Sequence, residues 1–292
     1  MGREFSCRLI LWQSGVGCAE LCARSRAEAA ASFEMATGLE QHQIEIQRNR
    51  AAWEGKALLR EIYAGFYERI VGLIDQRTDG AIVEVGSGIG NLRGRLPRAI
   101  ATDLFPNPWL DLVCDGYELP FEDRRVSHLI LFDVFHHLRA PMAFLGEARR
   151  VLAPGGRVIV FEPYISAMSY PVYGLLHHEP VALKGDINMA RSLERPRDYY
   201  AAQGNATRMF FATGAAANGR RDGGIAPCLE GWKVFHAEAF ASFAYLLSGG
   251  FSKPAMYPAG WLKGMERVDR KLSRWPRLFG ARCLVGLELA KV

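Results

Sequence analysis

The segment 82–90 constrains this chain more than any other stretch of its sequence. It begins as a branched apolar run that contains one acid, Glu84, and it ends in alternate glycines. The loop residues are Gly86, Ser87, Gly88 and Gly90. A short apolar run stopped by glycine is typical of a first parallel strand in an α/β sheet. Because alternate glycines let the backbone turn sharply and approach a ligand closely, we predict that a nucleotide-like ligand binds at this loop.

Acids also follow the next two predicted strands. Asp103 ends the apolar run at 99–102, and Asp115 follows the run at 110–114. Three carboxylates after three successive strands suit a ligand with a cationic amine, a ribose diol and an exocyclic amino group. The spacing G-x-G-x-G differs from the G-x-G-x-x-G of dinucleotide sites, and no cation in the loop would hold a pyrophosphate. An NAD(P)-dependent oxidoreductase is therefore a disfavoured alternative.

Two further motifs follow along the chain. The first, at 129–138, contains Asp133, Val134, His136 and His137, and the second, at 149–160, contains the turn Pro154-Gly155-Gly156. With these motifs, residues 81–163 resemble the class I S-adenosylmethionine-dependent methyltransferases, in particular the family called methyltransferase type 11. The resemblance implies a methyltransferase with S-adenosyl-L-methionine as its cofactor.

The resemblance also implies roles for single residues. Glu84 and the glycine loop would hold the methionine end of the cofactor, Asp103 the ribose hydroxyls, and Asp115 the adenine amino group. The predicted cofactor-binding residues are Glu84, Gly86, Ser87, Gly88, Gly90, Asp103, Leu104, Asp115, Gly116, Asp133 and Val134. For each acid, the alternative interpretation is a helix cap or a solvated loop end.

Short strands alternate with helices along the chain, which predicts a doubly wound α/β fold. We expect a mostly parallel, Rossmann-like sheet of seven strands with an inserted lid and an N-terminal helical cap. Beside the strand at 82–85, strands are expected near 98–102, 111–114, 128–132, 157–161, 252–257 and 283–289, and helices over 53–75, 91–96, 141–152, 239–248 and 261–272. The expected segments are 1–34, a disordered arm or mis-started stretch; 35–80, the helical cap; 81–163, the cofactor-binding core; 164–237, the acceptor lid; and 238–292, the completion of the sheet.

Composition narrows the class of protein. The formal net charge of +5 is mild and the arginines are scattered along the sequence, so nucleic-acid binding is disfavoured. No apolar run reaches the ~18 residues of a membrane span. None of the six cysteines lies in a C-x-x-C pair, which indicates reduced thiols in a cytoplasmic protein. We expect no metal site, because His177 and His178 are adjacent and lack the i, i+4 spacing of a helical site. The oligomeric state stays open.

The acceptor is predicted from position and from the motifs that the chain lacks. His136 and His137 follow the fourth strand, and a histidine can take the proton of a hydroxyl. We therefore expect one of them to be the catalytic base, with His137 slightly favoured. The alternative is that the pair only shapes the pocket. Further candidate acceptor contacts are Arg48, Asn49, Arg50, Trp53, Tyr164, Tyr170, Tyr173, His177 and His178. The chain lacks the [DN]-P-P-[YF] motif of many N-methyltransferases and the Asp-Asn pair of metal-dependent catechol-type enzymes. A small-molecule acceptor methylated on oxygen is what remains. A non-catalytic regulatory protein that binds S-adenosylmethionine is a second alternative.

Overall fold

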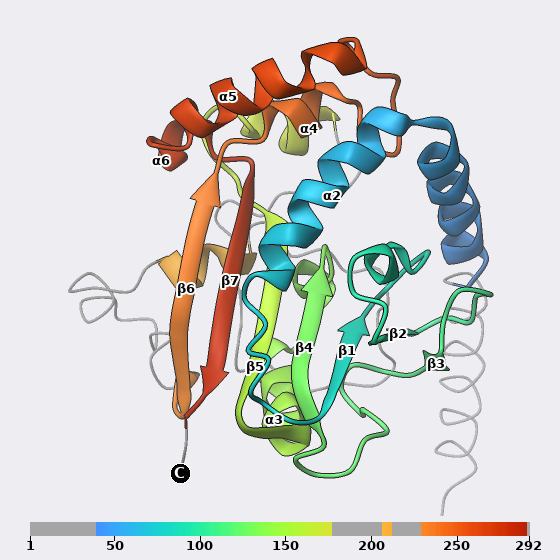
Figure 1. Ribbon diagram of the computed structural model, residues 1–292, viewed down its shortest axis with the longest axis vertical. Helices are drawn as coiled ribbons and strands as arrows, with labels where there is room; N and C mark the ends of the chain where they lie inside the picture. Colours follow the sequence, from blue (N-terminus) through green and yellow to red (C-terminus); the bar gives the residue numbers. More distant parts are fainter. Residues whose placement is uncertain (1–38, 177–205, 212–228, 291–292) are drawn as a thin grey trace, which may run out of the picture.

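A seven-stranded sheet forms the centre of the protein. Figure 1 shows the computed structural model, which describes residues 39–176, 206–211 and 229–290. The strands are β1 (Ala81–Val85), β2 (Ala99–Asp103), β3 (Leu112–Val113), β4 (Val126–Phe132), β5 (Leu152–Pro163), β6 (Trp232–Phe240) and β7 (Arg282–Leu289). Their order is β3-β2-β1-β4-β5-β7-β6, and β7 runs in the direction opposite to the other six strands. The predicted doubly wound, mostly parallel α/β sheet of seven strands is confirmed.

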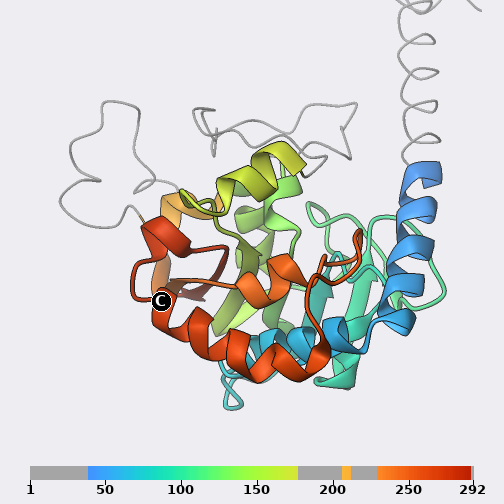
Figure 2. The same ribbon diagram turned by 90° about the horizontal axis from the view of Figure 1, so that it is seen from above.

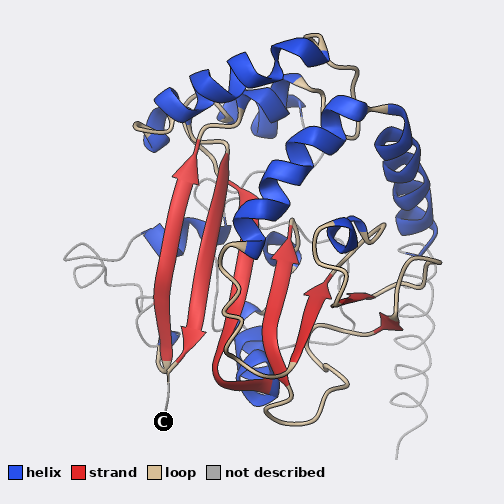
Figure 3. Ribbon diagram, in the orientation of Figure 1, coloured by secondary structure: helices blue, strands red, loops and turns tan. Residues whose placement is uncertain are grey.

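Helices cover both faces of the sheet and its carboxyl end (Figure 3). They are residues 39–55, α2 (Ala57–Val71), α3 (Pro141–Val151), α4 (Phe243–Leu247), α5 (Leu262–Leu272) and α6 (Pro276–Phe279), with short 3-10 or π turns at Asn91–Gly94, Phe135–His137, Val172–Leu176, Ala206–Phe211 and Ala259–Trp261. Within the described ranges, none of the helices has the length and the apolar character needed to cross a membrane.

Side chains that alternate along the central strands build two apolar layers. Leu129 and Val158 belong to the layer that packs against α3. Ile130 and Ile159 belong to the opposite layer, which packs against α2 and α4. Because β4 and β5 are buried on both faces, their inner residues, 129–132 and 158–161, read as short apolar runs, which is typical of parallel strands.

The helix predicted over 53–75 is interrupted at its beginning. Lys56 adopts an extended conformation, with φ −114° and ψ 93°, between residues 39–55 and α2. Its ammonium group donates to the carbonyl of Gly250 at 2.6 Å and also to that of Lys253. The break lets α2 lie across one face of the sheet while residues 39–55 stand beside its β2–β3 edge (Figure 1).

The edge strand predicted near 252–257 is wrong. These residues form turns, and the outer strand is β6, which pairs with β7 alone. The sequence analysis assigned the first part of β6 to the acceptor lid at 164–237 and its end to a helix at 239–248. A strand with one partner is buried only in part, and residues 233–239 are exposed or half-buried, so its pattern lacks the apolar run of an inner strand. Pro254, which has no N–H for a ladder, also disfavours a strand at 252–257.

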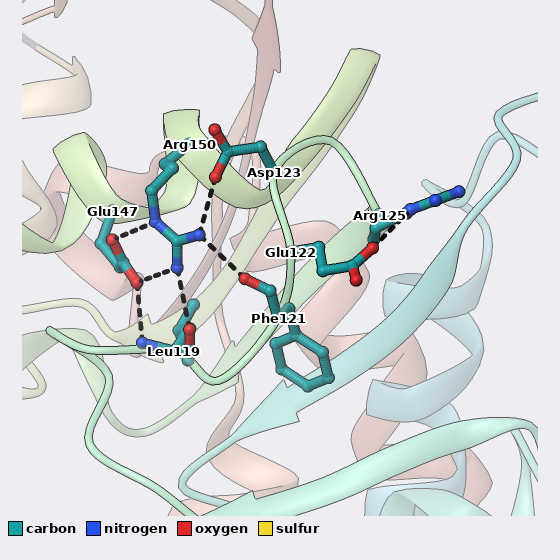
Figure 4. A network of polar contacts seen from close by, with 7 residues as sticks. All are labelled: Leu119, Phe121, Glu122, Asp123, Arg125, Glu147 and Arg150. Carbon is teal, nitrogen blue, oxygen red and sulfur yellow. Dashed lines mark hydrogen bonds and ion pairs between the residues drawn. The ribbon is translucent and has the colours of Figure 1, made fainter.

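A polar network ties α3 to the connection between β3 and β4 (Figure 4). The guanidinium of Arg150 donates to the Glu147 and Asp123 carboxylates and to the carbonyls of Leu119 and Phe121, at 2.6–2.9 Å. Glu147 in turn accepts the Leu119 N–H at 2.8 Å. Arg150 lies at the surface, so each ion pair adds little stability. The network's effect is to fix where the loop that follows Asp115 runs.

Candidate active site at the carboxyl end of the sheet

A cavity of ≈ 1750 Å³ opens at the carboxyl ends of β1, β4 and β5. Figure 2 looks down on this end of the molecule. The cavity wall comes from the glycine loop after β1, the turn after β4, residues of the 39–55 helix and the loop 249–254. Ligands of open α/β sheets bind at this end of the strands. Because one ligand usually occupies roughly 300–1,000 Å³, the volume is sufficient for a donor and an acceptor together.

Seven of the predicted site residues line this cavity. They are Glu84, Gly86, Ser87, Gly88, Asp133, His136 and His137. The other six are not among its lining residues, namely Gly90, Asp103, Leu104, Asp115, Gly116 and Val134. The structure therefore separates the predicted residues into those that line this cavity and those that do not.

The glycine loop has a backbone that residues with side chains rarely adopt. Gly86, Gly88 and Gly90 have φ values of +71°, +53° and +68°. A Cβ on Gly86 would overlap the side chain of Val134, which follows β4. At Gly88 the nearest atom to such a Cβ would be Cδ1 of Ile46, 3.9 Å away. The backbone at Gly88 is thus open on the cavity side, which permits close approach of a ligand.

Glu84 is a buried acid with unused hydrogen-bonding capacity. It is 4% exposed, and its Oε2 has no hydrogen-bond partner among the described residues. Burial raises the pKa of Glu84 to about 8, because a carboxylate in a poorly solvated place is costly to ionise. A cationic group placed in the cavity beside it would remove that cost. This buried acceptor therefore fits the ammonium group of an amino acid.

Asp103 and Asp115 support loops in the structure. The Asp103 carboxylate accepts the N–H groups of Gly88 at 2.9 Å and Leu104 at 2.7 Å. It therefore holds the glycine loop against the end of β2. Asp115 accepts the Tyr117 N–H at 2.9 Å. These contacts agree with the alternative interpretation of the two acids as groups that fix the end of a loop. They do not prevent either acid from contacting a ligand as well.

A histidine and a glutamate meet where β4 and β5 end. Nδ1 of His136 is hydrogen-bonded to the Glu162 carboxylate, which also accepts the N–H groups of Val134 at 2.8 Å and Phe135 at 2.6 Å. Glu162 is 1% exposed and His136 is 7% exposed. The ring of His137 lies against that of His136, with 4.0 Å between the centroids. The sequence analysis missed Glu162, although an acid directly after the apolar run of β5 is the same signal that selected Glu84.

A second buried pair lies beside the first. Asp133, a non-glycine residue with φ +54°, forms an ion pair with Arg282 at the start of β7. Arg282 is 1% exposed, and its guanidinium carbon lies 4.4 Å from the ring centre of Tyr245 and 5.6 Å from that of Phe161. Burial raises the pKa of Asp133, and the charge of Arg282 opposes this shift. No local pattern could have indicated Arg282, since 149 residues separate it from its partner.

The other candidate acceptor contacts are divided between the cavity and the surface. Arg48, Asn49 and Tyr173 line the cavity. Arg50 lies over the Trp109 ring, and Trp53 stacks near Phe251. Tyr164 and Tyr170 are outside the cavity lining, and His177 and His178 lie outside the described residues. In the part of the chain that the structure describes, no group of three or more His, Cys, Asp or Glu side chains could hold a metal ion.

Comparisons with known proteins were made by sequence and by structure. Residues 83–160 match the family model Methyltransf_11, described as a methyltransferase domain. No curated protein sequence matches the chain. Solved structures of similar fold include a Haloferax volcanii methyltransferase in complex with its Trm112 activator, with 17% identity over 87% of this chain and 97% of that one, and a TM-score of 0.49.

Two further solved structures of similar fold are described as methyltransferases that act on different atoms. A Thermotoga maritima protein described as a possible histamine N-methyltransferase has 15% identity over 84% of this chain and 99% of that one, with a TM-score of 0.47. Geranyl diphosphate C-methyltransferase from Streptomyces coelicolor, solved with S-adenosyl-L-homocysteine, has 14% identity over 78% of both chains and a TM-score of 0.43. Such distant likeness says nothing about the acceptor of this chain.

The sheet, the glycine loop with its buried acid and the family match define a class I S-adenosylmethionine-dependent methyltransferase. Residues 83–160 are the part of the chain that is similar to that methyltransferase domain. The cofactor is accordingly S-adenosyl-L-methionine, and the glycine loop and Glu84 offer a cradle that fits it.

Proposed function

We propose that this enzyme transfers a methyl group to a hydroxyl oxygen of a small-molecule acceptor, with His136 as the general base. The observation that carries the proposal is the hydrogen bond between His136 Nδ1 and the buried Glu162 carboxylate at the cavity. A carboxylate in this position selects the tautomer with the proton on Nδ1 and leaves Nε2 to accept a proton. The sequence analysis slightly favours His137, and the contact with Glu162 favours His136.

The bound cofactor supplies a methyl group on a positively charged sulfur, which an oxygen nucleophile can take. The residues of the chain align the acceptor, exclude water and take up the proton that the hydroxyl loses. When His136 receives that proton, the Glu162 carboxylate stabilises the imidazolium. Two backbone N–H groups also bond to Glu162, so its position depends little on the protonation of the histidine.

The remaining cavity residues suit the two ligands. Glu84 would accept a hydrogen bond from the ammonium group of the cofactor, and the backbone at Gly88 would allow close contact with it. Asp103 would act on the cofactor through the glycine loop that it holds and through its own carboxylate at the ribose. Tyr173, Arg48 and Asn49, which line the same cavity, would contact the acceptor.

The experiment is an acceptor screen followed by a matched pair of variants. A panel of hydroxylated small molecules is incubated with the enzyme and S-adenosylmethionine, and S-adenosylhomocysteine release and product mass are measured. With a turned-over acceptor, we expect His136→Gln to lower kcat roughly 10²–10⁴-fold, the usual contribution of a positioned base. His137→Gln, the matched control, should keep most of the activity, and neither change should alter cofactor affinity more than a few-fold.

Three results would contradict the proposal. A methyl group found on nitrogen or carbon would remove the need for a hydroxyl base. Loss of activity in His137→Gln with retention in His136→Gln would reverse the assignment. Tight cofactor binding without turnover of any acceptor would favour the regulatory alternative.

A further inference from the structure

The outer face of α5 and its flanking segments carries many positive charges. The exposed basic side chains are Lys253, Lys263, Arg267, Arg270, Lys271, Arg274 and Arg277. Residues 253–278 contain only two acids, Glu266 and Asp269, and therefore have a net charge of +5. The whole chain also has a net charge of +5, so the rest of it is neutral overall. We call this surface, made of these seven cations and the apolar residues described below, the α5 ridge.

The cations of the α5 ridge are not neutralised within the described residues. None of the seven is in an ion pair there. Elsewhere many arginines are paired, such as Arg150 with Glu147 and Asp123. Charges that remain unpaired on one face attract a partner of opposite charge.

Large apolar side chains are exposed on the same ridge. Trp261 is 65% exposed, Val268 48% and Trp275 56%. Their spacing of seven residues puts them along one side of α5 and its ends, next to the row of cations. Leu278 on α6 and Met256 before α5 are exposed as well, and Met168 lies beside Leu278, whose carbonyl accepts its N–H at 3.0 Å.

The opposite face of α5 is fixed to the body of the enzyme. Leu262 and Asp269 are buried. The Asp269 carboxylate accepts the N–H groups of Phe243 at 2.8 Å and Ala244 at 3.0 Å, and so caps the start of α4. α5 therefore cannot rotate its cations and tryptophans inward. In Figures 1 and 2 it lies along the outside of the molecule, over the carboxyl end of the sheet.

We propose that the α5 ridge docks on an anionic lipid bilayer. Lysine and arginine are attracted to the negative surface of such a bilayer, and tryptophan is favoured at the boundary between headgroups and acyl chains. A helix with a basic side and an apolar side lies in that boundary. A nucleic acid would use the cations but would leave both tryptophans, Val268 and Leu278 in water, so the bilayer is the partner that accounts for both kinds of side chain.

Docking in this way would put one rim of the active-site cavity at the lipid surface. Lys253 and Met256 line the cavity and also belong to the ridge. A hydroxylated acceptor that carries a lipid tail could then enter from the membrane, a consequence that rests on the proposed function. The docking itself does not depend on it, and its test below uses no acceptor.

The test is co-sedimentation of the full chain with vesicles. One set is phosphatidylcholine alone, and in the other about a third of the lipid is phosphatidylglycerol. We expect binding to the anionic vesicles only, weakened by added salt. Arg267→Gln, Arg270→Gln and Lys271→Gln together should lower the partition coefficient roughly a hundredfold, at about fivefold for each cation. The matched control, Arg95→Gln with Arg98→Gln and Arg124→Gln, removes as many exposed charges elsewhere and should bind like the native protein.

A second variant tests the apolar side of the ridge. Trp261→Ser with Trp275→Ser should reduce binding and abolish the blue shift of tryptophan emission that we expect when anionic vesicles are added to the native protein. Circular dichroism and thermal melting check that each variant is folded. No binding to anionic vesicles, equal binding of the two charge variants, or binding of an oligonucleotide but not of vesicles would overturn the proposal.

Discussion

The two ends of the central sheet each bury a histidine near acids, and the cavity described above lies at the carboxyl end. At the carboxyl end, His136 is bonded to Glu162 and lines the cavity. At the amino end, His128 is completely buried in β4, and its Nε2 accepts the Asp75 N–H at 3.0 Å. A buried histidine is therefore not by itself the mark of an active site. Open space beside the ring and an acid on its Nδ1 are what distinguish His136.

The acids at the amino end are neutralised by arginine. Arg157 contacts the Glu288 carboxylate at 2.9 Å and that of Asp75 at 3.5 Å, and it donates to the Leu73 carbonyl at 2.8 Å. These contacts join β5 to β7 and to the segment after α2. At the carboxyl end, in contrast, Glu84 keeps an unpartnered oxygen. Among the described residues, the acids of the amino end are thus paired within the protein, whereas Glu84 has hydrogen-bonding capacity left for a ligand.

The comparison between the two ends of the sheet can be tested by substitution, and we expect the largest loss of activity at Glu162. Glu162→Gln removes the charge that orients His136 and stabilises its protonated form, so we expect kcat to fall roughly 10³-fold. The same change at the other end, Glu288→Gln, should leave kcat within a few-fold and lower only stability. Steady-state kinetics with the acceptor from the screen measures both variants. Equal losses of kcat would show that the two ends do not differ in this way.

A smaller effect is expected at Glu84, and it depends on pH. The pKa of Glu84 is raised to about 8 from an ordinary 4.5, so between these values the folded protein holds a proton that the unfolded chain has lost. This group therefore makes the free energy of unfolding fall as pH rises through that window. The ammonium group of the cofactor favours the ionised carboxylate, so affinity should rise with pH until about 8.

Calorimetry and chemical denaturation of Glu84→Gln test both statements. The variant should lose about 2 kcal/mol of cofactor binding near pH 8, as expected for a charge-assisted hydrogen bond. Its cofactor affinity and its stability should both depend less on pH than those of the native enzyme. An unchanged affinity in a folded variant would mean that Glu84 does not contact the ammonium group.

The smallest effect is expected at His128. Burial lowers the pKa of His128 to about 4 from an ordinary 6.5, so between these values the unfolded chain takes up a proton that the folded protein does not. Its contribution to stability is present above pH 6.5 and is lost as pH falls towards 4. His128→Asn should flatten this acid-side slope by about 1 kcal/mol per pH unit while kcat at neutral pH stays unchanged. Denaturant titrations between these pH values measure the slope, and an equally steep slope in the variant would contradict the assignment.

The parts of the fold that depend on residues adjacent in the sequence could be predicted from it. β1 and the glycine loop are recognised locally, and Pro141 marks the start of α3. The sequence analysis did not predict β6, because a strand with one partner is only partly buried and lacks a clear apolar pattern. At the candidate site, Glu84 and the two histidines were selected from their places at or after the ends of strands. Glu162 carries the same local signal, but its contact with His136 depends on the pairing of β4 with β5. The α5 ridge also needs the structure, because cations that look scattered along the sequence share one face of a helix.

The contact between Gly86 and Val134 has a consequence for how this enzyme can change. The side chain of Val134 occupies the space that a methyl group on residue 86 would need. Any enlargement at position 86 would therefore push the turn that carries the two histidines away from its neighbours. A side chain at position 86 would thus require a smaller residue at 134 as well as a backbone with a φ of +71°, so we expect glycine to be kept there in any active variant.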